Sequence, residues 1–142
     1  MVDDIIAYID GAAKGNPGPA GIGVIFLKKD TSVLSEISHF IGIKTNNQAE
    51  YEALIAALEN AQNFKSLNIT FRTDSELIFR QIQGKYKVRD AKLKKYHRTA
   101  TELLTKLPLS KLELIPREEN CEADRLANWA VKNYLKSTRA MQ

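Results

Sequence analysis

The first apolar run of the chain places the strongest constraint on its fold. Residues 5–9, Ile-Ile-Ala-Tyr-Ile, are apolar at odd and even positions alike, so a strand here has two apolar faces. Such a strand must be covered on both sides, which is typical of the centre of a sheet that lies between helices. The run ends at Asp10 and enters residues 11–21, whose glycines and prolines predict a turn.

The remaining patterns predict strands and helices around that central strand. Short connections favour antiparallel hairpins between the first three strands, and a strand that follows a helix pairs in parallel. Strands are expected at 5–9, 21–27, 33–43, 67–73 and 111–115, and helices from 46 to about 64, at 75–83, at 91–106 and from 120 to about 136. This order predicts an α/β fold with a mixed five-stranded sheet, three antiparallel strands and then two parallel ones, flanked by helices.

Two of these helices carry start signals. Thr45 and Gln48 have the spacing of a capping box ahead of the first helix. Asn120 is of the residue type that caps a helix N-terminus, and it precedes the last helix. We therefore expect both side chains of the first pair, and that of Asn120, to bind backbone N–H groups.

The composition is ordinary for a globular domain. A length of 142 residues with 44% apolar and 27% charged residues suits a single domain over 1–142. The polar end, 137–142, is expected as a flexible tail or as a segment packed on the sheet. A single cysteine, Cys121, excludes an intrachain disulfide and a cysteine-rich zinc site. The acidic start and the lack of a long apolar run predict no secretion signal and no membrane span, so we expect a cytoplasmic monomer.

Positive charge is concentrated in one segment of the chain. The net charge is +4, yet residues 80–98 carry eight basic residues and one acid. An ordinary solvated helix face is one interpretation of such lysines. The clustering favours contact with phosphate groups instead, which would be independent of sequence and sensitive to salt. The candidates for this contact in the predicted loop are Lys85, Lys87 and Arg89.

Four carboxylates occupy positions that are not typical of a solvent-exposed surface. Asp10 and Asp74 each end a predicted strand, and if those strands are parallel neighbours, both carboxylates emerge at the same edge of the sheet. Glu50 shares its side of the first helix with the apolar stripe that begins at Leu54. Asp124 lies near the start of the last helix. Each acid alone could also cap a turn or favour the positive end of a helix.

Together, four acids at one edge repel one another unless positive charge lies among them. Two Mg²⁺ or Mn²⁺ ions held by carboxylate oxygens supply that charge and suit phosphodiester hydrolysis, since one activates water and the other stabilises the leaving oxygen. A covalent nucleophile is not predicted, because Cys121 has no evident histidine partner. The two histidines, His39 and His97, are interpreted as structural or surface residues.

Four segments in order resemble the motifs of type 1 ribonuclease H. They are Tyr8–Gly21, Thr45–Tyr51, Thr73–Ser75 and Pro116–Ala127, and the match spans nearly the whole chain. The resemblance implies a ribonuclease H-like fold and an endonuclease that cuts the RNA strand of an RNA–DNA hybrid, leaving 5′-phosphate and 3′-hydroxyl ends. It also implies two divalent metal ions, with catalytic and metal-binding roles for Asp10, Glu50, Asp74 and Asp124.

The resemblance further implies a set of substrate contacts. They fall on Gly11, Asn16, Thr45, Asn46, Asn47, Gln48, Ser75 and Glu76. Amide side chains can bind the 2′-hydroxyl groups that distinguish RNA from DNA, and a helix N-terminus at Thr45 can hold a phosphate. Helix capping is the alternative role for Asn46 and Asn47, and both roles can hold at once. Glu76 departs from the family, in which glutamine is common at that position.

Two other departures separate this chain from many bacterial members. The loop before Asp124 lacks their histidine, and Arg117 is the residue there that can meet a phosphate. Because an arginine stays protonated, Arg117 cannot act as a base, and we hypothesise that it stabilises the transition state or the departing product. The alternative is a surface arginine paired with Glu118 or Glu119. The second departure is segment 84–91, which is too short for their basic protrusion.

Two rival functions stay open from the sequence. A nuclease of broader range would also cut double-stranded RNA, because both duplexes present 2′-hydroxyl groups in a wide minor groove. A hybrid-binding module without catalysis is the non-enzymatic alternative, which the presence of all four acids disfavours.

Overall fold

A computed structural model describes residues 4–64 and 68–140 of the chain. The strands are β1 (Asp4–Ala13), β2 (Gly18–Lys28), β3 (Val33–Lys44), β4 (Asn68–Thr73) and β5 (Ser110–Leu114). The helices are α1 (Asn46–Ala61), α2 (Glu76–Ile82), α3 (Ala91–Thr105) and α4 (Cys121–Ala140), with 3₁₀ turns at Gln62–Phe64 and Arg117–Glu119. Every strand and helix expected from the sequence is present.

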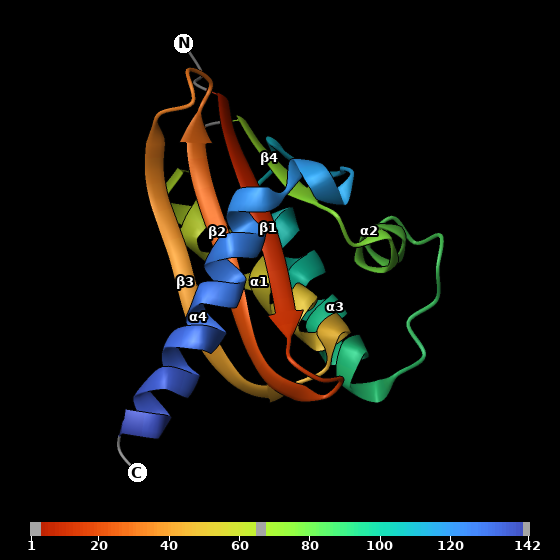
Figure 1. The fold of residues 1–142 in the computed structure, drawn as a ribbon. Helices are drawn as coiled ribbons and strands as arrows, with labels where there is room; N and C mark the ends of the chain where they lie inside the picture. The colour runs from red at the N-terminus through yellow and green to blue at the C-terminus, as the bar shows by residue number, and fades with distance from the viewer. Residues whose placement is uncertain (1–3, 65–67, 141–142) are drawn as a thin grey trace.

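The five strands form one mixed sheet with β1 at its centre (Figure 1). The strand order is β3-β2-β1-β4-β5. The first three strands pair antiparallel, and β4 and β5 continue the sheet in parallel with β1. The predicted sheet is confirmed, and so is the central position of the strand with two apolar faces.

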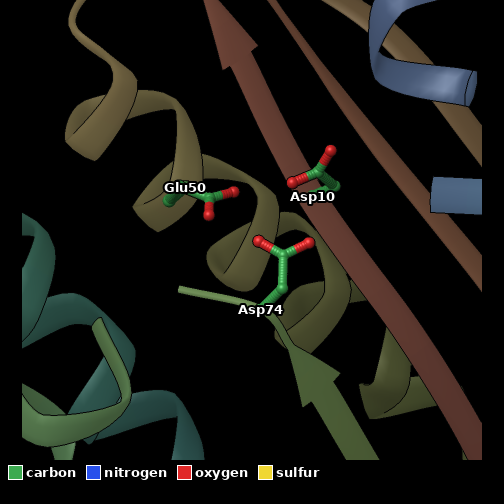
Figure 2. Close-up of side chains that lie close together, drawn as sticks. All are labelled: Asp10, Glu50 and Asp74. Carbon is green, nitrogen blue, oxygen red and sulfur yellow. The ribbon is translucent and has the colours of Figure 1, made fainter. Parts of the chain in front are cut away.

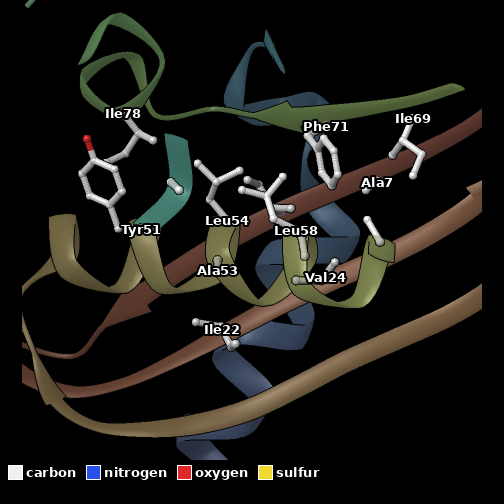
Figure 3. Packing of buried hydrophobic residues seen from close by; sticks show 14 of the residues in the cluster. Ala7, Ile22, Val24, Tyr51, Ala53, Leu54, Leu58, Ile69, Phe71 and Ile78 are labelled. Atoms are coloured by element: carbon white, nitrogen blue, oxygen red, sulfur yellow. The ribbon is translucent and has the colours of Figure 1, made fainter. Parts of the chain in front are cut away.

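Helices cover both faces of this sheet. In Figure 1, α4 crosses one face, while α1 and α3 lie behind the other. The apolar stripe of α1 is fully buried, with Leu54 and Leu58 packed toward Phe71 of β4 (Figure 3). Each large apolar side chain buried in this way stabilises the fold by about 1.5–3 kcal/mol, so this face of the sheet anchors α1 firmly.

The packing of α4 on the other face depends on a glycine in β2. A Cβ atom added to Gly23 would lie 2.1 Å from the backbone oxygen of Ala123. This distance is a steric clash, so any residue other than glycine would push α4 away from β2. The missing side chain lets the first turn of α4 rest directly on β2, beside β1. This close approach carries Asp124 to the centre of the sheet.

The ends of β1 and α4 differ from those expected. Strand β1 continues to Ala13, because Ala13 still pairs with Ala20 of β2. The turn between β1 and β2 is therefore shorter than the predicted turn over residues 11–21. Helix α4 continues to Ala140 instead of ending near Lys136. Its second half is held by Tyr134, whose ring stacks on Phe40 of β3 at a centroid distance of 3.7 Å. The expected tail is therefore helical as far as residue 140.

Two expectations fall outside the described residues. They are the start of the fourth strand at Leu67 and the last two residues, 141–142. The helices that are described are all too short or too polar to cross a membrane.

Candidate active site

Three carboxylates from separate elements meet at one edge of the sheet. Oxygen atoms of Asp10, Glu50 and Asp74 lie within 4.8 Å of one another (Figure 2). The strand register explains the aspartates, because Tyr8 of β1 pairs with Arg72 of β4 and each aspartate follows two residues later. We call these three residues the acidic cluster. Their predicted convergence is confirmed.

Glu50 reaches the cluster from α1 because of a second glycine. A Cβ atom on Gly11 would lie 2.2 Å from the carbonyl carbon of Ala49, so only glycine lets β1 and α1 come this close. The Gly11 N–H group donates a hydrogen bond to Glu50 Oε1 and fixes the carboxylate. The predicted capping box is also present, with Thr45 and Gln48 holding the start of α1 through reciprocal hydrogen bonds.

Asn120 has a role that sequence reasoning missed. Its Nδ2 group donates to Asp74 Oδ2 at 2.9 Å and to the carbonyl oxygen of Ile9 at 2.8 Å. The side chain is only 1% exposed, and its Oδ1 atom has no hydrogen-bond partner among the described residues. The prediction that this side chain caps α4 was wrong: it turns inward and joins Asp74 to β1. Its polar type suits both roles, so only the packing distinguishes them.

Asp124 approaches the cluster from the α4 side. It is not one of the three residues whose oxygens lie within 4.8 Å of one another. Burial is the main cause of the raised pKa of Asp10, and the Asp124 carboxyl group adds to it, so the two side chains are neighbours. Asn128, one turn further along α4, donates to Asp124 Oδ1 at 3.1 Å. The structure thus brings all four predicted acids to one region, because β1, which carries Asp10, packs against α1, β4 and α4.

The electrostatics of the cluster are those of a site that lacks positive charge. Burial raises the pKa of Asp10 far above its usual range, and the charges of Glu50 and Asp74 raise it further. Burial also raises the pKa of Glu50, and the hydrogen bond from the Gly11 N–H group opposes this effect by lowering the pKa. Oxygen-only donors of this kind fit a hard divalent cation such as Mg²⁺ or Mn²⁺, which would favour the ionised carboxylates.

Arg117 lies on the 3₁₀ turn that precedes α4, and its side chain is exposed. Burial is the main cause of the raised pKa of Glu50, and the positive charge of Arg117 lowers that pKa. The guanidinium is therefore within electrostatic reach of the cluster. Among the described residues it forms no ion pair with Glu118 or Glu119. The surface pairing considered from the sequence is therefore not observed.

The polar residues expected to contact substrate line the start of α1. The Asn16 side chain accepts a hydrogen bond from the Asn46 N–H group at 3.0 Å, and Asn46 Oδ1 accepts one from Ala13 at 3.2 Å. Asn46 thus links the start of α1 to the end of β1 by hydrogen bonding, while Asn47 is exposed. Ser75 caps α2 next to Asp74.

The basic candidates lie on a separate segment, residues 84–90 between α2 and α3, which we call the basic loop (Figure 1). Lys85, Lys87 and Arg89 are all exposed there. The buried Gln81 side chain anchors the loop, because it accepts from Tyr51 at 2.6 Å and donates to the carbonyl oxygen of Lys87 at 3.4 Å. The structure does not bring these three side chains into the acidic cluster.

The β3-β2-β1-β4-β5 sheet, with carboxylates at the ends of its central parallel strands, defines a ribonuclease H-like protein. The chain belongs to the family described as reverse transcriptase-like, which matches residues 8–130. The resemblance to type 1 ribonuclease H is thereby confirmed. A ribonuclease HI from Halobacterium salinarum is 44% identical over 125 residues, which make up 88% of this chain and 63% of that protein.

Solved structures are similar over most of both chains. A ribonuclease H1 isolated from compost superposes with a TM-score of 0.88 and 46% identity, covering 93% of this chain and 98% of that one. The same enzyme in complex with an RNA/DNA hybrid gives a TM-score of 0.87 over 92% of this chain and 99% of that one. The chain spans less than two thirds of the first curated relatives, 63% of the Halobacterium protein and 38% of a Mycobacterium bovis protein.

Proposed function

We propose that this protein hydrolyses the RNA strand of RNA–DNA hybrids and leaves 5′-phosphate and 3′-hydroxyl ends. The observation that carries the proposal is the acidic cluster, whose three carboxylates share one edge of a ribonuclease H-like sheet. Relatives named ribonuclease H, one of them solved with a hybrid, support the choice of substrate.

Asp10, Glu50, Asp74 and Asp124 would hold two divalent ions, Mg²⁺ or Mn²⁺. When bound, such ions lower the pKa of the attacking water and neutralise charge on the leaving oxygen. The protein supplies the fixed positions of the ligands. Gly11 orients Glu50, Asn120 orients Asp74, and Asn128 orients Asp124 through the hydrogen bonds described above.

Arg117 completes the proposed chemistry as a phosphate ligand. It stays protonated at all relevant pH values, so it acts by charge and by hydrogen bonding, not as a base. Its positive charge acts on Glu50, which supports a contact with a phosphate bound at the cluster. An Arg117→Ala variant should therefore lose turnover or raise KM. The control is Lys111→Ala, which removes an exposed cation of β5 that already pairs with Glu113 at 3.4 Å. Unchanged kinetics of Arg117→Ala would remove this residue from the mechanism.

Recognition of the hybrid would involve two groups of residues. The first group lies on β1, on the β1–β2 turn and at the starts of α1 and α2: Gly11, Asn16, Thr45, Asn46, Asn47, Gln48 and Ser75. Their polar groups would meet 2′-hydroxyls and phosphates, except the N–H groups of Gly11, Thr45 and Asn46, which are already hydrogen-bonded within the protein. The capping box uses only the oxygen of the Gln48 amide. The second group is the basic loop, with Lys85, Lys87 and Arg89 as phosphate contacts.

One assay tests the proposed activity against its rivals. Labelled RNA–DNA hybrid, RNA duplex and DNA duplex are each incubated with Mg²⁺, Mn²⁺ or chelator, and the product ends are mapped. Cleavage of the hybrid alone, with metal alone, is the expected result. Cleavage of the RNA duplex as well would identify the broader nuclease, while tight hybrid binding without cleavage under any metal would identify a binding module.

A further inference from the structure

The outer face of α4 carries a stripe that the proposed chemistry does not use. The inner face of the helix packs on the sheet through buried residues such as Ala127 and Val131. The opposite face presents Arg125, Trp129, Lys132 and Lys136, spaced four, three and four residues apart. This spacing aligns them along one side of the helix over about 17 Å. We call these four residues the α4 stripe.

The α4 stripe borders a shallow depression that begins at the active site. The depression has a volume of about 620 Å³, and its lining includes Asp124 together with the whole stripe. The depression shares Asp124 with the four acids proposed to bind metal, so one end of it lies at the proposed active site. A chain that leaves the cluster on this side meets the stripe next.

The stripe combines an exposed aromatic ring with three cations, of which Arg125 pairs with Glu122. Trp129 is the single tryptophan of the chain, and it is 51% exposed. Large aromatic side chains are usually buried, because burial of their apolar surface stabilises the fold. From Arg125 to Ala140 the helix contains no acidic residue. Within the described residues, neither Lys132 nor Lys136 has an ion-pair partner.

These features fit single-stranded nucleic acid. A groove that binds single strands combines cations that follow the backbone with aromatic rings on which unpaired bases stack. In a duplex the bases are already stacked, so an indole face has little to bind there. Asp124 belongs to the acids proposed to act on the RNA strand, and the strand that continues past it is therefore RNA.

We propose that the α4 stripe binds the single-stranded continuation of the RNA strand where it leaves an RNA–DNA hybrid, with Trp129 stacked on a base and Lys132 and Lys136 on phosphates. The inference rests on the proposed function for its choice of strand. Its consequence is a preference for hybrids with an RNA overhang on one side over blunt hybrids.

The single tryptophan allows a direct test. The Asp10→Asn protein, with Mg²⁺ present, is titrated with a blunt hybrid and with the same hybrid carrying a 5′ RNA, 3′ RNA or DNA overhang, and Trp129 emission is recorded. Emission should be quenched by one of the two RNA overhangs, with affinity at least about 5-fold above that for the blunt hybrid, as stacking of one base predicts. Equal quenching by the blunt hybrid or the DNA overhang overturns the assignment, as does unchanged emission throughout.

Variants of the stripe give the matched measurement. In the same background, Trp129→Ala and the double variant Lys132→Glu/Lys136→Glu should abolish the overhang preference, measured by fluorescence anisotropy of labelled hybrids. The control is Lys28→Glu/Lys29→Glu, which makes the same charge change on exposed lysines at the β2–β3 turn. A preference that survives in the stripe variants contradicts the proposal. Cleavage of blunt hybrid by the wild-type protein is scored separately, so failure of the proposed nuclease activity is distinguishable from failure of the stripe.

Discussion

The acidic cluster and the basic loop bear opposite charge and are built in opposite ways. Asp10 is buried and the other two carboxylates are half-buried. Backbone or amide groups orient two of the three: the Gly11 N–H group holds Glu50, and Asn120 holds Asp74. The three cations of the basic loop are exposed, and the buried side chain that anchors the loop, Gln81, binds a backbone oxygen and not a cation.

This difference matches the two tasks. Chemistry at a phosphodiester needs ligands held at fixed positions, and a small displacement is costly. Attraction of a phosphate backbone needs only charge near the surface, and flexible side chains provide it. The comparison predicts that substitutions in the cluster act on turnover and on metal binding, and that substitutions in the loop act on affinity and on salt dependence.

The largest effect is expected at Asp10. Asp10→Asn keeps the size of the side chain but removes its charge at the centre of the cluster, so kcat should fall by about 10³-fold or more while hybrid binding stays within a few fold. Steady-state cleavage and a binding titration measure the two quantities. The control is Asp30→Asn, at the exposed β2–β3 turn. Near-normal turnover of Asp10→Asn would contradict the assignment of the chemistry to the acidic cluster.

A smaller loss is expected at Asn120, which supports the cluster without belonging to it. Asn120→Ala removes the hydrogen bonds to Asp74 and to the Ile9 carbonyl oxygen, so metal affinity or kcat should fall by about 10–100-fold. Stability should drop by about 1–3 kcal/mol, because a buried acceptor loses its partner. Metal titration by calorimetry and thermal unfolding test both effects. Asn60→Ala, which removes an amide bound within α1, is the control.

The pH dependence of stability tests the crowding of the acids. Without metal, the folded protein holds protons on Asp10 and Glu50 at a pH where the unfolded chain has lost them, since both pKa values are raised. The free energy of unfolding should therefore decrease as pH rises above about 4, the ordinary carboxyl value, by about 1.4 kcal/mol or more up to pH 7. Urea unfolding in chelator at several pH values measures it. Excess Mg²⁺ should remove the decrease, and an unchanged slope would argue against metal at these groups.

The smallest effect is expected in the basic loop. Replacing Lys85, Lys87 and Arg89 together by alanine should raise KM several fold at low salt and leave kcat unchanged. The slope of log affinity against log salt should become shallower by up to about 0.9 for each phosphate that the variant no longer binds. Alanine at Lys28, Lys29 and Lys106, three exposed lysines elsewhere, controls for net charge. A fall in kcat specific to the loop variant would mean that the loop takes part in the chemistry.

The sequence carries more information about the cluster than about its supports. Asp10 and Asp74 could be predicted because a charge at the end of an apolar strand is seldom needed for packing, and Glu50 because it shares a side with Leu54. The inward turn of Asn120 could not be predicted, because an asparagine ahead of a helix satisfies the capping pattern whether or not its side chain caps. The full length of α4 depends on Tyr134 stacking on Phe40, a contact between distant segments that no local pattern contains.

The parallel pairing of β1 with β4 has a consequence for folding kinetics. The connection between these strands runs through β2, β3 and α1, and this unit supplies Asp10, Glu50 and Asp74 in chain order. Closing that unit forms a contact of long sequence separation and brings three like charges together in the same event, and both effects slow it. A divalent ion that relieves the repulsion should therefore slow unfolding.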